Sequence, residues 1–537
     1  EENKGSGAVY VVANKGGAEP QLLVAAPASD PKFSPDGRRL SFLRGGQVWA
    51  VGLALGGPAG IQASGEPAQI SKLEGGLGGA LWATNSYEWS PDSAYIAVVA
   101  RGVAGRGYDT TAAADDANTD MLVVERTFYK WNAGWNPAIQ TDGSYTPTHI
   151  WIVPTHIGGG NARCLTDGDQ DDHSVTWSPD STEICFVSNR TGDWDNNGNN
   201  SLFAVSIESG ATRRITDTDG PEFQPVWSPD GEWIACLHSN PTSKDSPAED
   251  TAVCVVPAAG GPLTLVSTEL DQRCGSPQWS HHSKWIYFTA NAEGNTHVYR
   301  VRKTGGEVVQ VTTGERSVGS YALVTEGSAD HRTTGDGHNI LVCTMSSHST
   351  PPELYRFGVP SGDAEMALTA VSARLLAEVE TQSPLELRYE SFDGTPIQGW
   401  VMPPYGGPPP PARGEKVPAV LMIHGGPHGS FGSNWSPRTH IFSGDGYAVI
   451  YLNPRGSTGY GQQFTRGCVQ VLAQCRHGLF PIDCFFVVGL LTFVVKNDRL
   501  SPSFPPPCPL SGAGLGWRRL QRSNGGRRRS HRCPPMD

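Results

Sequence analysis

The sequence predicts two kinds of structure in one chain: a repeated all-β domain of the propeller type, followed by the beginning of an α/β domain with an incomplete parallel sheet. Three observations lead to this prediction. A short turn phrase recurs five times in the first 290 residues, it stops before residue 380, and apolar strands that end in glycine-rich loops follow it. At 537 residues the chain is also too long for a single hydrophobic core.

Composition and charge exclude several classes of protein. Hydrophobic residues make up 38% and charged residues 18% of the chain, which excludes a wholly disordered chain and a polytopic membrane protein. A formal net charge of -12 argues against nucleic acid as the main partner. The charge is uneven, because 471–537 contain ten Lys and Arg against three Asp and Glu. That segment carries +7, which leaves -19 for the preceding 470 residues.

The recurring phrase is an aromatic residue followed by Ser-Pro-Asp and then Gly or Ser. Its copies are 33–37, 89–93, 177–181 and 227–231, and a decayed copy lies at 279–283. Ser-Pro-Asp-Gly is typical of turns, so the aromatic residue ends one strand and the apolar run behind the turn forms the next. The intervals of 50 to 88 residues accommodate about four strands each, which is the size of a propeller blade.

Within each unit we expect a structural role for the phrase, with the tryptophan packed between sheets and the aspartate capping the turn. A weaker sixth unit surrounds Asp336 and 340–343, so the sequence leaves the number of blades open. The longest interval contains 101–145, which is rich in Asp, Gly and Asn and is expected to be a long loop or insertion. A propeller alone indicates no chemistry.

From Leu385 onward the pattern is that of a hairpin followed by two buried strands. Alternation over 385–392, a turn at Asp393-Gly394 and a return strand over 397–402 predict the hairpin. Behind a proline-rich loop at 403–412, the runs 417–423 and 447–452 are continuously apolar, as in strands buried on both faces.

Both apolar runs end in glycine-rich loops. The first continues as His-Gly-Gly-Pro-His-Gly over 424–429 and the second as Asn-Pro-Arg-Gly-Ser-Thr-Gly-Tyr-Gly over 453–461. A Gly-Gly pair directly after a buried parallel strand lets main-chain amides point into a crevice, as an oxyanion hole requires. A tight turn that uses glycine for its positive φ explains the same pair, and both interpretations stay open here.

A propeller followed by these two motifs resembles the prolyl oligopeptidase family of serine peptidases, and the motifs are most similar to its acylaminoacyl-peptidase branch. The resemblance covers roughly 10–470. It implies a β-propeller of TolB- or WD40-like repeats over 1–375 and the N-terminal part of an α/β-hydrolase peptidase domain over 376–470. It also implies cleavage of short or N-acylated peptides through an acyl-enzyme, with a Ser-His-Asp triad.

The resemblance assigns roles to six residues of the two motifs. It makes the backbone amides of Gly425 and Gly426 the oxyanion-hole candidates. The residues that shape the site and its loops would be His424, Pro427, Arg455 and Gly456, none of them a member of the triad. The resemblance further implies no metal and no organic cofactor, and a cytoplasmic location.

The family's catalytic residues have no counterparts in the sequence. No serine has Gly two positions before and two positions after it, so the Gly-x-Ser-x-Gly nucleophile elbow is absent. Ser430 and Ser457 come closest in composition, but both belong to the earlier motifs. His477 and His531 are not at plausible places for the base. Without nucleophile and base the family mechanism cannot turn over, so we expect the chain as written to be inactive.

The tail, 471–537, is expected to be aberrant and disordered. Its apolar run 479–495 is shorter than the roughly 20 residues of a transmembrane helix and contains Asp483. Binding of nucleic acid by its basic end is the functional alternative. Back-translation favours another origin, because permitted codons for 514–526, shifted by one base, spell Asp-Trp-Gly-Gly-Gly-Asp-Tyr-Asn-Asp-Leu-Met-Ala.

That spelling resembles what the family carries directly after a Cys-Val-Gln such as 468–470. Codons for Val471 and for Ala513-Gly514 can also supply the borders of an intron. We therefore hypothesise that 471–513 is translated intron and that 514–537 is read out of frame. The unfinished sheet would then leave strands 417–423 and 447–452 without neighbours.

Partners and alternatives follow from the same observations. Seven of the 11 cysteines lie singly outside the tail, mostly in apolar runs, and are expected to be buried reduced thiols. No Cys-x-x-Cys pair supports a metal site. Short peptides are the expected partners, nucleic acid and membrane are not, and a homo-oligomer is left open. The rival interpretation is a non-catalytic binding scaffold with a vestigial hydrolase module.

Overall fold

The structure is a computed structural model in which β-strands predominate and three helices are described. The residues it describes are 7–13, 16, 19–57, 60–73, 77, 86–101, 130–131, 134–135, 146–156, 161–194, 197–239, 249–325, 339–359, 365–406, 417–426, 428–475 and 492–495.

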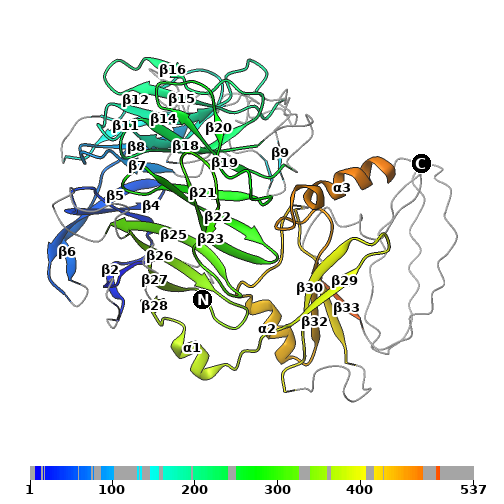
Figure 1. The fold of residues 1–537 in the computed structure, drawn as a ribbon. Helices are drawn as coiled ribbons and strands as arrows, with labels where there is room; N and C mark the ends of the chain where they lie inside the picture. The colour runs from blue at the N-terminus through cyan, green and yellow to red at the C-terminus, as the bar shows by residue number, and fades with distance from the viewer. Residues whose placement is uncertain are drawn as a thin grey trace, which may run out of the picture. The chain divides into compact units, whose positions relative to one another are not determined.

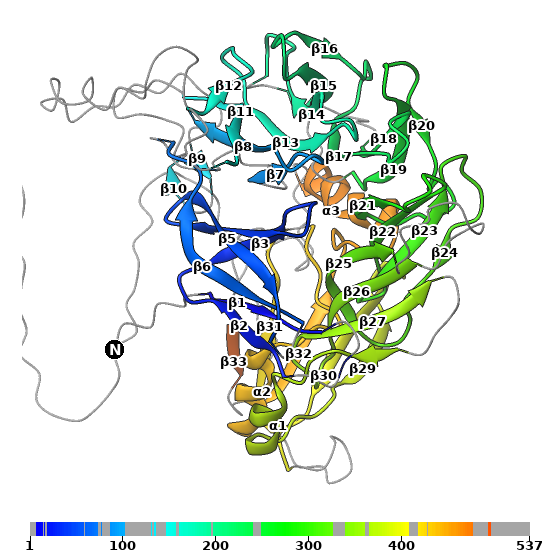
Figure 2. The same cartoon turned by 90° about the vertical axis from the view of Figure 1, so that its left-hand side faces the viewer.

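Four antiparallel sheets of four strands each follow one another along the chain (Figures 1 and 2). The first consists of β3 (Ser29–Phe33), β4 (Arg39–Arg44), β5 (Gln47–Leu55) and β6 (Ile61–Gln69). The second consists of β7 (Tyr87–Trp89), β8 (Tyr95–Arg101), β11 (Thr148–Pro154) and β12 (Arg163–Cys164). The third consists of β13 (Asp172–Trp177), β14 (Glu183–Ser188), β15 (Ser201–Ser206) and β16 (Thr212–Arg214). The fourth consists of β17 (Glu222–Trp227), β18 (Trp233–His238), β19 (Ala252–Pro257) and β20 (Thr264–Leu265).

An eight-stranded sheet comes next and contains two further groups of four strands. One group is β21 (Cys274–Trp279), β22 (Trp285–Ala292), β23 (Asn295–Arg302) and β24 (Val309–Gln310). The other is β25 (Ser317–Thr325), β26 (Asn339–Ser346), β27 (Glu353–Val359) and β28 (Met366–Ala367). A single parallel pair between Thr296 and Ser317 joins them. The strand expected at 340–343 is therefore present, inside β26.

Two short hairpins complete this part of the chain. One is β1 (Val9–Val11) with β2 (Gln21–Val24), and the other is β9 (Lys130–Trp131) with β10 (Gly134–Trp135). The second hairpin belongs to the stretch 101–145, which otherwise lies almost wholly outside the described residues.

The hydrophobic core lies between neighbouring sheets. Val99 of the second sheet and Phe186 of the third share one cluster of buried side chains, and Cys185 of the third sheet shares another with Trp227 of the fourth. Leu237 of the fourth sheet packs in a cluster with Phe288 of the next. Each of these sheets thus buries apolar side chains against its neighbour, as stacked blades require. Closure into a propeller with a defined number of blades stays a prediction.

The phrase residues have the structural roles that the sequence predicts. The indole nitrogen of Trp177 donates to the carbonyl of Glu88 in the preceding sheet at 3.1 Å, and that of Trp279 donates to the carbonyl of Val226 at 2.9 Å. The Asp36 carboxylate accepts from the Ser34 hydroxyl at 2.6 Å, which closes the turn. These bonds and the associated apolar contacts account for the phrase without any ligand.

A recurrent bulge in the first strand of several units was not predicted. The pairing register shifts three residues before the aromatic residue of the phrase in four units. The residues at these places have positive φ angles of 47° to 56° and are Asp30, Ser174, Gln224 and Ser276. Only one of the four is an Asp, Asn or Gly, so the sequence carries no strong signal for a left-handed residue here.

After α1 (Ala373–Glu378), a five-stranded sheet has the order β29-β30-β32-β31-β33 (Figure 1). Its strands are β29 (Leu385–Glu390), β30 (Pro396–Met402), β31 (Ala419–Met422), β32 (Ala448–Asn453) and β33 (Thr492–Val495). The hairpin predicted over 385–402 is thereby confirmed as β29 and β30, which pair antiparallel. β31 and β32 pair parallel, as their apolar character suggested.

The expectation that the two apolar strands lack neighbours is wrong. β32 lies between β30 and β31, and β33 pairs antiparallel with the other edge of β31. The physical reason is that the return strand of the hairpin adds to β32 from a distance in sequence. β33 comes from the tail, whose remaining residues after Cys475 lie outside the described part of the chain.

Two helices connect strands of this sheet in sequence: α2 (Pro437–Gly444) lies between β31 and β32, and α3 (Gln462–Cys475) lies between β32 and β33. α3 runs five residues past Gln470, the last residue before the expected break. None of the helices in the described ranges has the length and apolar character that a bilayer crossing needs.

Candidate functional site

The two glycine-rich loops lie at the same edge of the five-stranded sheet. β31 leads into His424 and β32 leads into Pro454, and the two strands run parallel with Met422 paired to Tyr451. Because the carboxyl ends of parallel strands meet at one edge, both loops emerge side by side. This is the place where open α/β sheets bind their ligands.

Hydrogen bonds tie the two loops together. The Asn453 side chain accepts from the Phe431 amide at 2.7 Å and donates to its carbonyl at 2.9 Å. The Thr458 amide donates to the Gly429 carbonyl at 3.2 Å. Asn453 is fully buried, so these bonds fix the first loop against the second.

Gly426 has a conformation and a packing that only glycine permits. Its φ is 145°, and a Cβ would lie 2.6 Å from the main-chain nitrogens of His428 and Gly429. Neither its amide nor that of Gly425 donates a hydrogen bond to another described residue. Within the described part of the chain neither amide has an acceptor, which is what the oxyanion-hole interpretation needs. Pro427, the next residue of the motif, lies outside the described residues.

His424 and Ser457 form a close pair across the two loops. The imidazole Nε2 is 3.0 Å from Ser457 Oγ, and Nδ1 is 3.1 Å from the Gly425 carbonyl oxygen. Burial lowers the pKa of His424, so the ring is neutral at neutral pH. A serine beside a neutral histidine is the arrangement of a nucleophile and its base, but Ser457 has no exposed surface and cannot reach a substrate.

Ser430, the other candidate serine, has no such histidine partner among the described residues. Its hydroxyl oxygen accepts from Thr458 Oγ1 at 3.5 Å. His477 and His531 lie outside the described residues. The described residues therefore bring together the two glycine-rich loops but no nucleophile, base and acid in contact. They also contain no group of three or more His, Cys, Asp or Glu able to hold a metal ion.

His428 and Gly456 connect the two loops a second time. His428 donates from Nδ1 to the Gly456 carbonyl at 3.0 Å, and burial lowers the pKa of this histidine. Gly456 has a φ of 100°, and its amide donates to the Phe464 carbonyl of α3. Gly456 thus shapes the loop by linking it to α3.

The Arg455 side chain contacts the turn of the β29–β30 hairpin. It donates to Asp393 Oδ1 at 2.8 Å, and its guanidinium lies over the Phe392 ring, 5.0 Å from the centroid. The arginine side chain is 9% exposed, so this pairing fixes the loop rather than presenting a free charge. Hydrogen bonds from Thr395, together with Arg455, lower the pKa of the Asp393 carboxyl.

The turn between β22 and β23 also contributes to the site. The Gly294 carbonyl accepts from the Ser433 amide at 2.7 Å, and the Glu293 amide donates to the Gly459 carbonyl at 2.9 Å. A Cβ on Gly432 would lie 2.1 Å from the Gly294 carbonyl oxygen, so glycine is required there. The repeated sheets and the five-stranded sheet therefore meet at the edge where the glycine loops emerge.

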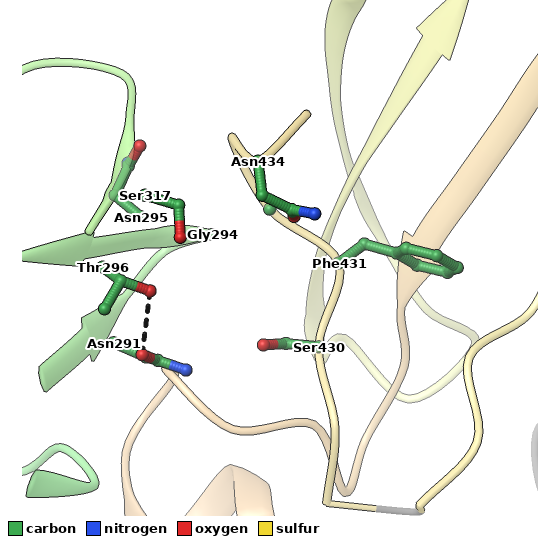
Figure 3. Close-up of a pocket in the computed structure, with 9 residues that line it drawn as sticks. Asn291, Gly294, Asn295, Thr296, Ser317, Ser430, Phe431 and Asn434 are labelled. Atoms are coloured by element: carbon green, nitrogen blue, oxygen red, sulfur yellow. Dashed lines mark hydrogen bonds between the residues drawn. The ribbon is translucent and has the colours of Figure 1, made fainter. Parts of the chain in front are cut away.

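A cavity of about 130 Å³ lies at this junction (Figure 3). From the β22–β25 region it is lined by Asn291, Asn295, Thr296 and Ser317, and from the segment directly after the first glycine loop by Ser430, Phe431 and Asn434. Figure 3 shows Ser430 directed toward Asn291, whereas the Phe431 ring turns away, toward Tyr451, whose ring centroid is 5.4 Å distant.

The lining of this cavity is polar and carries no charge. Asn291 and Thr296 hydrogen-bond to each other at 3.0 Å, and Asn295 accepts from the Arg316 amide at 3.1 Å. The neighbouring Glu293 does not line the cavity, and its carboxylate pairs with Arg388 at 2.7 Å. Amide and hydroxyl groups of this kind recognise neutral peptide groups rather than ions.

A second junction involves α3 and was missed by sequence reasoning. Arg466 donates to both carboxylate oxygens of Glu249, and the Gln462 amide at the start of α3 donates to Asp271 Oδ1 at 3.0 Å. Glu249 and Asp271 lie near the ends of blade-like strands without any motif. In the sequence, Glu249 and Asp271 are distinguished only as charged residues close to an apolar strand. Many solvent-exposed residues share this property, so it does not identify a contact.

Comparison with known proteins gives several similar peptidases. The chain is 28% identical to the uncharacterized peptidase YuxL of Bacillus subtilis over 464 residues, which are 84% of this chain and 64% of that protein. It is 28% identical to dipeptidyl-peptidase 5 of Porphyromonas gingivalis over 213 residues, 39% of this chain and 28% of that protein. It is 30% identical to the human acylamino-acid-releasing enzyme over 195 residues, 34% of this chain and 24% of that protein.

Among solved structures, the acylaminoacyl peptidase of Pyrococcus horikoshii has a similar fold. The TM-score is 0.59 at 19% identity, over 83% of this chain and 60% of that chain. The matches cover less than two thirds of the length of each of these four proteins. No protein-family model matches the chain.

Proposed function

We propose that this chain, which is similar to peptidases of the prolyl oligopeptidase family, represents part of a serine peptidase that cleaves short or N-acylated peptides through an acyl-enzyme. The names of its relatives support peptide hydrolysis, since they include a peptidase, a dipeptidyl-peptidase and an acylamino-acid-releasing enzyme. In the proposed architecture a propeller over 1–375 precedes a hydrolase module over 376–470.

One observation carries the proposal: the amides of Gly425 and Gly426, which donate to no other described residue, lie at the carboxyl edge of the parallel pair β31–β32. In acyl transfer the carbonyl oxygen of the scissile amide gains negative charge in the tetrahedral intermediate. Two preorganised N–H donors would stabilise that oxyanion. His424, buried and neutral beside Ser457, would position the loop that presents them.

The nucleophile is missing from the printed sequence, so we propose that this chain does not turn over peptides. A Gly-x-Ser-x-Gly elbow would place the attacking hydroxyl, and a histidine would accept its proton and return it to the leaving amine. The hypothesis that 471–513 is intron and 514–537 is out of frame accounts for this absence. The substrate-facing half of the site would then be present without the chemical half.

The uncharged cavity favours a blocked amino terminus over a free one as the substrate group held there. A free α-ammonium needs a carboxylate or several oriented acceptors when it leaves water, and no carboxylate is among the described residues that line the cavity. A neutral acyl-amide can hydrogen-bond to Asn291, Asn434 and Ser430. We therefore place the chain nearer to acylamino-acid-releasing than to dipeptidyl activity.

The experiment is to sequence the transcript across the codons for Gln470 to Gly514. A spliced product that continues into a Gly-x-Ser-x-Gly elbow is then expressed and assayed with N-acetylalanine p-nitroanilide and alanyl-alanine p-nitroanilide. We expect hydrolysis of the acetylated substrate in preference, abolished when the elbow serine is replaced by alanine. The printed chain should give no hydrolysis above buffer; measurable turnover by it would contradict the proposed inactivity.

The second candidate is a non-catalytic binding scaffold, and the absent elbow is the observation that favours it. A mature transcript that retains the whole of 471–513, together with a soluble and stably folded product, would support it. Titration of that product with an N-acetylated dipeptide amide separates the two cases further. Binding without hydrolysis is expected of a scaffold that keeps the peptide site.

A further inference from the structure

Strand β29 combines an unpaired edge with an uncovered face. It is the first strand of the five-stranded sheet and, among the described strands, pairs only with β30. All six of its residues are exposed, including Leu385 at 51%, Leu387 at 36% and Tyr389 at 41%. An exposed edge strand with apolar side chains readily pairs with a strand of another chain.

The pattern of hydrogen bonds shows which main-chain groups of β29 are free. Directly after β29, the Ser391 amide donates to the Thr395 carbonyl, and this pair continues the antiparallel register of β29 and β30. Because successive residues alternate in direction, the amides and carbonyls of Leu385, Leu387 and Tyr389 face β30 as well. Those of Glu386, Arg388 and Glu390 face the free edge.

We propose that β29 pairs antiparallel with β29 of a second copy of this chain, with the two-fold axis passing through Leu387. In this register Glu386 lies opposite Arg388 of the second copy, and each residue exchanges both main-chain hydrogen bonds with the other. Leu387 faces its own counterpart, and Leu385 faces Tyr389. The same six residues thereby supply both halves of an isologous interface.

Charge selects this register over the neighbouring one. A two-fold axis through Arg388 would also bring free main-chain groups together, but it would place Arg388 opposite Arg388 and Glu386 opposite Glu390. Like charges directly opposite each other destabilise a strand pair, whereas opposite charges stabilise it. In the proposed register both charged pairs are of opposite sign.

The intramolecular contacts of Arg388 hold its charge at this edge. Its guanidinium donates to Glu386 and Glu293, both at 2.7 Å, yet the side chain remains 55% exposed. A further carboxylate from a second copy can therefore approach it. On the opposite face the Leu387 side chain is 36% exposed, so Leu387 of a second copy can pack beside it.

The test is sedimentation velocity of the full chain over a wide range of concentrations, which should reveal a monomer–dimer equilibrium. Leu387→Lys, which places two ammonium groups at the axis, should raise the dissociation constant at least about tenfold. Glu386→Arg should do the same by facing Arg388 with a second cation. The exchange Glu386→Arg/Arg388→Glu should restore association, because it reverses both charges of each pair.

Ile441→Lys is the matched control, since Ile441 is a 63% exposed apolar residue on α2, away from β29. Its dissociation constant should equal that of the unmodified chain. Hydrogen exchange gives an independent readout: the amides of Glu386 and Arg388 should become protected as concentration rises. A chain that stays monomeric throughout, or a dimer that is insensitive to both single changes and leaves these amides unprotected, would overturn the proposal.

Discussion

At the scale of single residues, the backbone conformation at the last position of the repeated phrase explains why this position is occupied by either glycine or serine. This residue has a left-handed φ of 54° to 77° in each copy, and glycine occupies it in two of them, at Gly37 and Gly231. Where serine stands instead, its hydroxyl reaches the turn of the preceding unit. Ser93 accepts from the Asp36 amide and Ser181 from the Asp92 amide, both at 3.1 Å.

Replacing Ser181 separates the two effects. Ser181→Ala keeps the strained φ of 62° and leaves the Asp92 amide without its acceptor, so we expect a loss of about 1–2 kcal/mol in the free energy of unfolding. Ser181→Gly loses the same hydrogen bond but relieves the strain, so its loss should be smaller. Chemical unfolding of both variants measures the difference. Equal losses would mean that the conformation carries no strain.

Gly426 offers a second test at this scale. Gly426→Ala should destabilise the first glycine loop, because the new Cβ would lie 2.6 Å from two main-chain nitrogens. Gly394→Ala is the control, since Gly394 also has a positive φ but nothing lies near its Cβ position. We expect faster hydrogen exchange around 424–429 only in the first variant, and a penalty near 1 kcal/mol from φ alone in the second. Identical exchange in both variants would show that the loop has room to adapt.

Sequence reasoning was successful at residues whose role depends on local chemistry. The turn phrase and the two glycine loops could be found because Ser-Pro-Asp-Gly and Gly-Gly restrict the backbone wherever they occur. The contact between His424 and Ser457 could not, because 33 residues separate them and only the parallel pairing of β31 and β32 brings them together. The polar lining of the cavity was missed for the same reason.

At the scale of elements, the site is built by segments that lie far apart in sequence. The hairpin β29–β30 was predictable from alternation and an Asp-Gly turn, but its pairing with β32 was not, and the expectation of unpaired apolar strands was therefore wrong. Helix α3 illustrates the same limit. Its first turn is capped by Asp271, and its Arg466 pairs with Glu249, both supplied by the repeated sheets.

The pair of Arg466 and Glu249 should couple strongly. The Glu249 side chain is only 5% exposed, so Arg466→Leu removes a cation that pairs with a buried carboxylate and should lower the free energy of unfolding by about 3 kcal/mol. Glu249→Gln in the same chain should recover part of that loss, because no buried charge remains. A double-mutant cycle by chemical unfolding measures the coupling. Additive effects would show that α3 docks without this ion pair.

At the scale of the whole molecule, aromatic rings and two histidines join the repeated sheets to the five-stranded sheet. His348, just after β26, contacts Trp400 of β30 and Tyr451 of β32, with ring centroids 5.8 and 6.4 Å apart. Its carbonyl accepts from His440 of α2 at 2.8 Å. Burial, and secondarily His440, lower the pKa of His348 from 6.5 to about 4.

This shift makes the junction sensitive to acid. Between pH 6.5 and about 4 the unfolded chain binds a proton at His348 and the folded chain does not, so stability falls as the pH decreases through that window. The lowered pKa corresponds to at most about 3 kcal/mol. His348→Gln keeps a polar group beside Tyr451 but cannot titrate, so its thermal midpoint should fall less on acidification. The exposed His156→Gln serves as control and should follow the unmodified chain. If His348→Gln and the unmodified chain lose stability in parallel across the window, the acid sensitivity resides in other groups, and His348 would have to become charged without breaking the junction.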